Sequence, residues 1–179
     1  MQTEDKFIHI DWDGPYSLEA VEKLNGSTDK GIYQIYGSHP LYGSSVLLYI
    51  GRTIETFATR VLTHKVYRNN PDAGHVEVYI GRLFGISTPT DWFRQIELAE
   101  ALLIYANQPV DNVQRELRGL EPELRRIHVI NWHRYRSLLP EVSGACWAER
   151  FSDVHNYQHF DTKNLAQNAQ TSASPSDGL

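Results

Sequence analysis

The sequence has little cysteine and no long apolar segment, and both absences restrict the class of protein. Cys146 is the only cysteine among 179 residues, which excludes an internal disulfide and a cysteine-built zinc site. We expect this thiol to fill a core position. No apolar run approaches the roughly 20 residues that span a bilayer, and the first ten residues are acidic where a signal peptide is basic and apolar. We therefore expect an intracellular, cytoplasmic protein that does not enter a membrane.

The chain also lacks an excess of basic charge. Its net charge of −5 argues against a surface that binds phosphates throughout. One segment differs, because residues 113–140 hold six Lys/Arg against three Asp/Glu, together with Trp132, His133 and Tyr135. Its basic residues are Arg115, Arg118, Arg125, Arg126, Arg134 and Arg136. Such a mixture either contacts phosphates and bases or belongs to a helix whose arginines pair with Glu116, Glu121 and Glu123.

What is present is an ordinary globular composition, with 41% hydrophobic and 22% charged residues. Two β-branched and aromatic runs at 31–36 and 46–50 predict neighbouring antiparallel strands joined by a long loop, and the alternation in 75–83 predicts a third strand. A helix capped by Thr53 is expected through residue 67, and another, capped by Thr90-Asp91, over 92–106. Residues 122–138 favour a helix, although Ile127, Val129 and Ile130 would also suit a strand.

These elements predict an α+β fold: a small three-stranded, mainly antiparallel sheet flanked by helices, in the core order β-β-α-β-α, with a largely helical C-terminal extension. Residues 1–30 would be a lead-in, 31–112 the core, and 113–163 an extension that packs on it. Residues 164–179 are too polar to order themselves. The late aromatic residues are expected to pack against the domain; they are Trp147, Phe151, Tyr157 and Phe160.

Two tripeptides carry the clearest functional signal. Gly31-Ile32-Tyr33 on the first predicted strand and Tyr49-Ile50-Gly51 on the second resemble the motifs that name the GIY-YIG endonuclease family. Tyr-Ile-Gly-Arg also occurs at 79–82, so the following residues must distinguish the copies. The resemblance implies an Arg and a His one turn apart on the next helix, and only the first copy is followed by such a pair, Arg60 and His64.

The resemblance also implies a metal-binding Glu on a later helix and an Asn beyond it. Glu100 and Asn112 fit the pattern Glu-x-x-Leu-Ile-x4-Pro-x-x-Asn. Glu97 is a rival, but Glu100 lies on the apolar stripe of its helix, where a carboxylate is costly unless it is paired or bound to a metal. Glu97 is expected to be solvated or paired with Arg94. One departure is the longer loop within residues 37–45, a cheap insertion.

The resemblance implies a metal-dependent endonuclease that hydrolyses phosphodiester bonds in DNA. Glu100 would bind Mg²⁺ or Mn²⁺, Arg60 the scissile phosphate, and Asn112 would orient the phosphate or the groups around the metal. Tyr33 is the candidate general base and Tyr49 its positioning partner, although the two could exchange roles. The alternatives are a catalytically silent nucleic-acid-binding domain and a protein-interaction domain that retain the fold.

Overall fold

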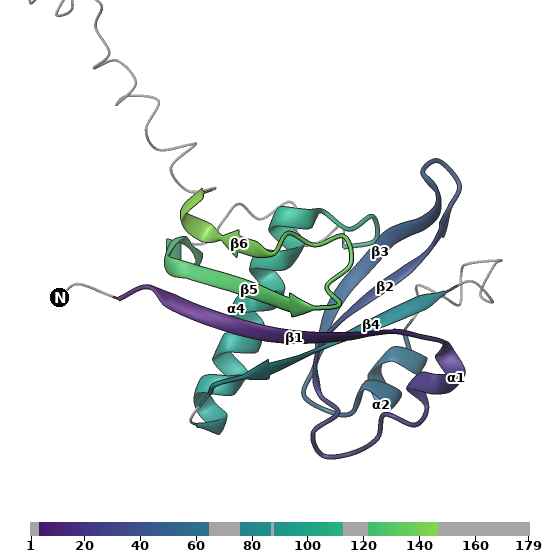
Figure 1. Cartoon of the computed structure of the whole chain (residues 1–179), viewed down its shortest axis with the longest axis horizontal. Coiled ribbons are helices and arrows are strands. Elements are labelled where there is room, and N and C mark those ends of the chain that lie inside the picture. Colours follow the sequence, from purple (N-terminus) through teal and green to yellow (C-terminus); the bar gives the residue numbers. More distant parts are fainter. Residues whose placement is uncertain (1–3, 65–75, 87, 113–121, 147–179) are drawn as a thin grey trace, which may run out of the picture.

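The computed structural model describes residues 4–64, 76–86, 88–112 and 122–146, which build a twisted mixed sheet of six strands (Figure 1). The strands are β1 (Lys6–Tyr16), β2 (Gly31–His39), β3 (Gly43–Thr53), β4 (Glu77–Phe84), β5 (Ile127–His133) and β6 (Glu141–Ser143). The helices are α1 (Leu18–Val21), α2 (Phe57–Leu62), α4 (Pro89–Asn107) and a 3-10 helix at Pro122–Arg126. Across the sheet the strands follow the order β3-β2-β4-β1-β5-β6.

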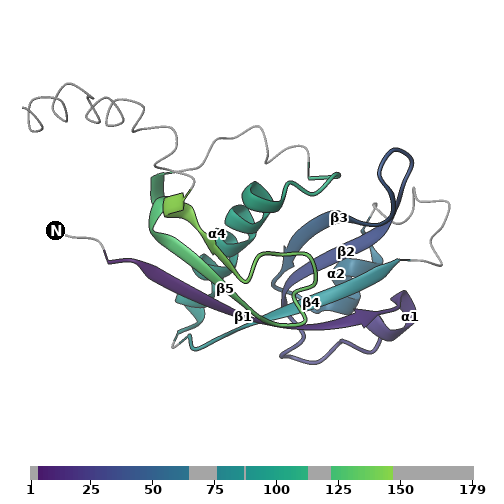
Figure 2. The same ribbon diagram turned by 45° about the horizontal axis from the view of Figure 1, so that its top comes forward.

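This sheet corrects the predicted architecture, because a small three-stranded sheet flanked by helices is wrong. Strand β1 comes from the predicted lead-in and lies within the sheet, antiparallel to β4 and parallel to β5. Strands β5 and β6 come from the extension that was expected to be largely helical. The long β1 strand crosses the whole molecule in Figure 2.

Alternation explains why these two segments are strands. In β1, Ile8, Ile10 and Trp12 are buried while the residues between them are partly or fully exposed, which is the period of two that a sheet requires. In β5, Ile127 and Val129 are buried in the same way. The buried polar residue Asn131 accepts a hydrogen bond from the Trp12 indole at 2.8 Å and donates one to the Leu139 carbonyl at 2.8 Å.

The antiparallel pairing of the first two predicted strands is confirmed, with Tyr33 opposite Gly51 in the β2–β3 register. The helix after them begins later than expected, because Thr56 rather than Thr53 caps it by accepting a hydrogen bond from the Thr59 amide. The predicted helix at 92–106 is present as α4, with Thr88 as its cap. The strand predicted at 75–83 is present as β4.

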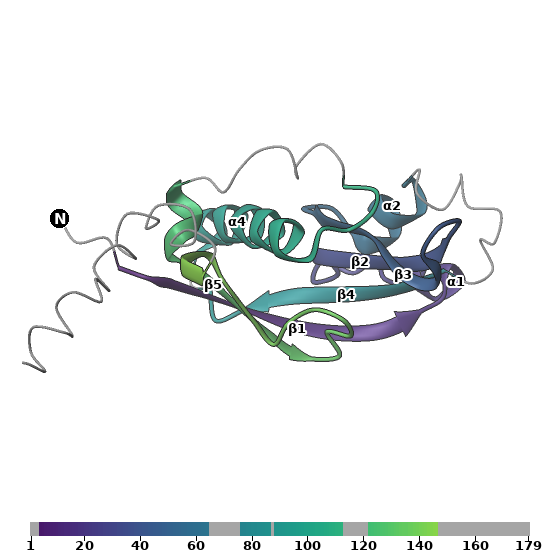
Figure 3. The same cartoon turned by 90° about the horizontal axis from the view of Figure 1, so that it is seen from above.

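Two clusters of buried residues lie on opposite faces of the sheet. One contains Ile8, Ile10 and Ile32 and packs against the buried side of α4. The other contains Tyr33 and Ile35, whose side chains point away from those of Ile32, and packs against α1 and α2. Figure 3 shows α4 along one side of β1 and β5, while no described helix covers their other side.

Three remaining predictions concern single features. Cys146, expected in the core, is exposed. Within the described ranges, no helix is long and apolar enough to cross a membrane. The tail at 164–179, the late aromatics from Trp147 onward, and residues 113–121 lie outside the described residues.

Candidate functional site

Three of the predicted site residues form a ring cluster around the β2–β3 pair. Tyr33 on β2 and Tyr49 on β3 point to the same face of the sheet, and their ring centroids are 6.1 Å apart. His64 lies directly after the α2 C-cap, with its ring 4.1 Å from that of Tyr49 and 6.2 Å from that of Tyr33. The sheet register and the short helix α2 therefore bring together residues from both motifs and from the segment that follows them.

Gly51 is the residue that allows the two tyrosine rings to pack here. A Cβ at this position would lie 2.5 Å from Tyr49 Cε1 and 2.6 Å from the Tyr33 hydroxyl oxygen, far inside contact distance. The glycine of the second tripeptide is thus required by the position of the rings, since a side chain would displace both.

The Tyr33 hydroxyl is fully buried and, among the described residues, has no hydrogen-bond partner of good geometry. Burial raises the pKa of this phenol well above its ordinary value, and the nearby Tyr49 adds to the increase. The Arg60 guanidinium acts in the opposite direction and lowers the pKa, but burial outweighs it. Tyr33 is therefore protonated at neutral pH in this structure, and a role as base would require more positive charge nearby.

Burial has the opposite effect on the imidazole of His64. Burial, together with the smaller effect of the positive charge of Arg60, lowers the pKa of His64 from 6.5 to about 4. His64 is thus neutral at physiological pH, with its ring packed against those of Tyr49 and Tyr33.

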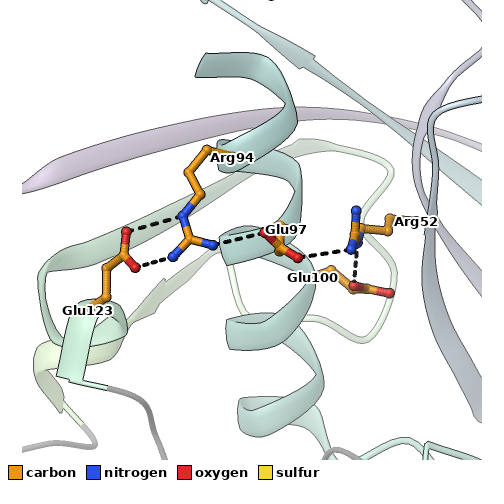
Figure 4. A network of polar contacts seen from close by, with 5 residues as sticks. All are labelled: Arg52, Arg94, Glu97, Glu100 and Glu123. Atoms are coloured by element: carbon orange, nitrogen blue, oxygen red, sulfur yellow. Dashed lines mark hydrogen bonds and ion pairs between the residues drawn. The ribbon is translucent and has the colours of Figure 1, made fainter. Parts of the chain in front are cut away.

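Glu100 lies on α4 and is 6% exposed, as its place on the apolar stripe predicts. Its Oε2 accepts a hydrogen bond from Arg52 Nε at 2.9 Å, and Arg52 also reaches Glu97 at 3.1 Å. Glu97 in turn pairs with Arg94 at 2.8 Å, as expected, and Arg94 contacts Glu123, so that five charged residues alternate in sign (Figure 4). The buried carboxylate is thus neutralised by a guanidinium from β3.

Arg52 is a site residue that the sequence analysis did not single out. Its signal was available, because it directly follows Tyr49-Ile50-Gly51 and therefore points to the face opposite Gly51, toward α4. The other copy ends in Arg82, which pairs with Asp29 at 2.6 Å on the face of α1 and α2. The identical tetrapeptides therefore place their arginines in different surroundings.

A polar cleft of about 330 Å³ lies at the edge strand β3. Arg60 from α2 and Glu100 from α4 both line it, together with Arg52, Thr53, Ile54 and Glu55. It combines two guanidinium groups with two carboxylates, of which that of Glu100 is nearly buried and that of Glu55 is exposed. Guanidinium groups match phosphate oxygens, so the cleft has the charge pattern of a phosphate site with an acidic residue at its inner wall.

The described residues contain no group of three or more His, Cys, Asp or Glu that could hold a metal ion. This donor set still fits Mg²⁺, which keeps several of its waters and is bound through one or two carboxylates together with substrate phosphates. Glu100 would supply the first carboxylate and Glu55 is the other acid in the cleft. Arg52 competes for Glu100, so a cation there would have to displace or share this guanidinium.

Asn112 holds the backbone of β3 and does not line the cleft. Its side chain accepts a hydrogen bond from the Ile50 amide and donates one to the Ile50 carbonyl, both at 2.9 Å. The preceding residues continue this pairing, since the Asp111 amide donates to the Leu48 carbonyl at 2.8 Å. Residues 110–112 thereby cover the outer edge of β3 up to Ile50, next to the start of the cleft at Arg52.

In the described part of the basic segment 113–140, some arginines contact other residues of the fold and others are exposed. Arg134 donates to the Gly14 carbonyl at 2.7 Å, and Arg136 pairs with Glu77 and packs over the Tyr36 ring at 4.3 Å. Arg125 and Arg126 are exposed. Arg115 and Arg118 lie outside the described residues. Arg134 and Arg136 thus make contacts within the fold, and none of the described arginines of this segment lines the cleft.

Comparison of the chain with known protein families, with curated proteins and with solved structures finds no match. The geometry of the site is therefore what supports a functional proposal.

Proposed function

We propose that the chain is a metal-dependent endonuclease that hydrolyses phosphodiester bonds in DNA, and that it belongs to the GIY-YIG type. The observation that carries the proposal is the convergence of Arg60 and Glu100, on separate elements, in one polar cleft beside the tyrosine rings. Phosphodiester hydrolysis needs a charge sink for the transition state and a means to activate water, and both can be assigned to residues at this edge of the sheet.

Each side chain has a defined task in this proposal. Arg60 binds the scissile phosphate through its fixed fork of donors, and Arg52 faces the same cleft as a second guanidinium. Glu100 would hold Mg²⁺ or Mn²⁺, which supplies Lewis-acid stabilisation of the phosphate charge. Tyr33 would accept the proton of the attacking water, with Tyr49 and His64 keeping its ring in place.

Tyr33 can accept a proton only while its surroundings favour phenolate. In the structure its raised pKa opposes this, and Glu100 is one of the causes of the increase. A cation bound by Glu100 would cancel that contribution and add positive charge near the phenol, which has to offset burial, the largest cause of the increase. The proposal therefore expects base function of Tyr33 only when Glu100 has bound its cation.

The experiment compares two isosteric variants on the same helix face, Glu100→Gln and Glu97→Gln. Each is incubated with supercoiled and branched DNA in Mg²⁺ and in EDTA, and cleavage is measured on gels. Wild type should cleave only with Mg²⁺, and Glu100→Gln should lose at least about 100-fold in rate. Glu97→Gln should stay within a few-fold, because Glu97 does not line the cleft and Arg52, which it also contacts, keeps its hydrogen bond to Glu100.

Thermal unfolding followed by circular dichroism provides the control for folding. Cleavage by a folded Glu100→Gln variant at the wild-type rate would reject Glu100 as the metal ligand. A wild-type protein that binds DNA in a salt-sensitive manner but cleaves none of it would favour the silent nucleic-acid-binding alternative.

A further inference from the structure

An exposed cluster of rings on the sheet, here called the ring face, is unrelated to the cleft. It consists of Phe7, His9, Phe84, His128 and Trp132, on β1, β4 and β5. Phe7 stacks on His128 at 4.8 Å, while His9 lies 5.5 Å from Phe84 and 6.1 Å from Trp132. The Trp132 indole donates to His9 Nδ1 at 3.2 Å, so the rings form a pair and a group of three on one side of the sheet.

The ring face is the side of β1 and β5 that α4 does not cover. Phe7 and His9 alternate with Ile8 and Ile10, whose side chains pack against α4 on the other side (Figure 3). Phe7 is 58% exposed, Phe84 47% and Trp132 44%. The solvent side of a half-covered sheet is normally polar, and an exposed aromatic patch of this kind marks a contact surface.

The described chain ends beside this face. Ser143 on β6 pairs opposite His128, which pairs opposite Phe7, so the three side chains share the ring face side. Cys146 follows three residues later and is exposed. The 33 residues from 147 to 179 therefore start within reach of the rings.

The sequence of this segment matches the face in pattern and length. Trp147, Phe151, Val154 and Tyr157 follow one another at spacings of four, three and three, the pattern of a helical apolar stripe. Fourteen residues as a helix would span about 21 Å, whereas the rings extend from His128 to Trp132, about 13 Å along β5.

Charge at the rim argues against a phosphate-bearing occupant. Asp11 and Glu141 are exposed at the two ends of the patch and would repel a nucleic-acid backbone. We propose that residues 147–160 of this chain cover the ring face, with Trp147, Phe151 and Tyr157 packed on its rings. This inference does not depend on the nuclease proposal.

A double-mutant cycle in the full chain tests the contact. Trp132→Ala, Phe151→Ala and the double variant are unfolded in urea, and the changes in the unfolding equilibrium constant are compared. Contact predicts that the double variant departs about fivefold or more from the product of the single changes. Phe93→Ala with Phe151→Ala is the matched control and should be multiplicative within about twofold, because Phe93 is a similarly exposed ring on α4.

A second measurement protects the test against a variant that fails to fold. Histidine labelling with diethyl pyrocarbonate, read by mass spectrometry, should rise several-fold at His9 and His128 in Phe151→Ser and stay unchanged at His39 in the β2–β3 hairpin. Multiplicative changes for Trp132 and Phe151, or unchanged labelling, overturn the proposal. It is also overturned by a concentration-dependent dimer that Trp132→Ala dissociates, or by single-stranded DNA that protects His9 in the wild type.

Discussion

The Gly51→Ala substitution would place a methyl group against both tyrosine rings of the candidate site. Its Cβ would lie 2.5 Å from Tyr49 and 2.6 Å from the Tyr33 hydroxyl oxygen, about 0.9 Å short of ordinary contact at the closest atom. Tyr33 and Tyr49 lie on the paired strands β2 and β3, so their rings cannot move away without strain in these strands. Overpacking of this kind costs about 1–3 kcal/mol in unfolding free energy, and we expect a value near the middle of that range.

Gly81→Ala is the matched control, since it changes the glycine of the other Tyr-Ile-Gly copy. The added Cβ would meet Ile10 at 2.6 Å and Trp12 at 2.9 Å, in the core on the α4 side and away from the cleft. The loss of stability should be similar, about 1–3 kcal/mol, but the two tyrosines would keep their positions.

Thermal unfolding and DNA cleavage separate the two effects. A chain of this size loses about 2–4 °C in Tm for each kcal/mol, so both variants should melt several degrees below wild type. Cleavage measured well below both melting temperatures should fall about 100-fold for Gly51→Ala, the scale expected for a 1 Å displacement of a reacting group. Gly81→Ala should cleave as wild type does. An unchanged Tm for Gly51→Ala, or equal losses of cleavage in both variants, would refute the reasoning.

Two further predictions concern stability alone. Asn112→Ala should lower the unfolding free energy in urea by about 2–4 kcal/mol, because it leaves the buried amide and carbonyl of Ile50 without partners. The control Asn107→Ala loses one hydrogen bond at the end of α4 and should cost about 1 kcal/mol. Similar costs for the two variants would contradict this explanation. The folded chain keeps His64 neutral down to about pH 4, whereas the unfolded chain protonates it near its ordinary pKa of 6.5. Between these two pH values the unfolded state binds more protons, so Tm should fall as the pH drops from about 6.5 to about 4. His64→Gln should flatten that decline, and parallel Tm curves would contradict the assignment.

The spacing of apolar residues along the chain correctly predicted the elements whose residues are close together in the sequence. The runs at 31–36 and 46–50 paired as expected, and the stripe on α4 correctly indicated that Glu100 is buried and that Glu97 pairs with Arg94. Strand β1 was missed although Ile8, Ile10 and Trp12 alternate clearly, because the acids between them and the following turn residues suggested a lead-in.

The pairing of distant strands could not be read from the sequence. Strand β5 pairs with β1 across about 120 residues, and only that contact decides that 127–133 is a strand rather than part of a helix. The site showed the same limit. The tyrosines and Glu100 were found by motif, but the salt bridge between Arg52 and Glu100 depends on how α4 crosses β3.

The parallel pairing of β1 with β5 also orders events during synthesis. One edge of β1 can pair with β4 once residue 84 has left the ribosome, but the other edge has no partner until residues 127–133 follow. At about 5–20 residues per second, that interval lasts roughly 2–10 s. During it, Ile8, Ile10 and Trp12 belong to a sheet with an open, unpaired edge, the form in which nascent chains are prone to associate. Addition of β5 therefore covers the open edge of the long strand β1, and β6, only three residues long, then leaves a short outer edge.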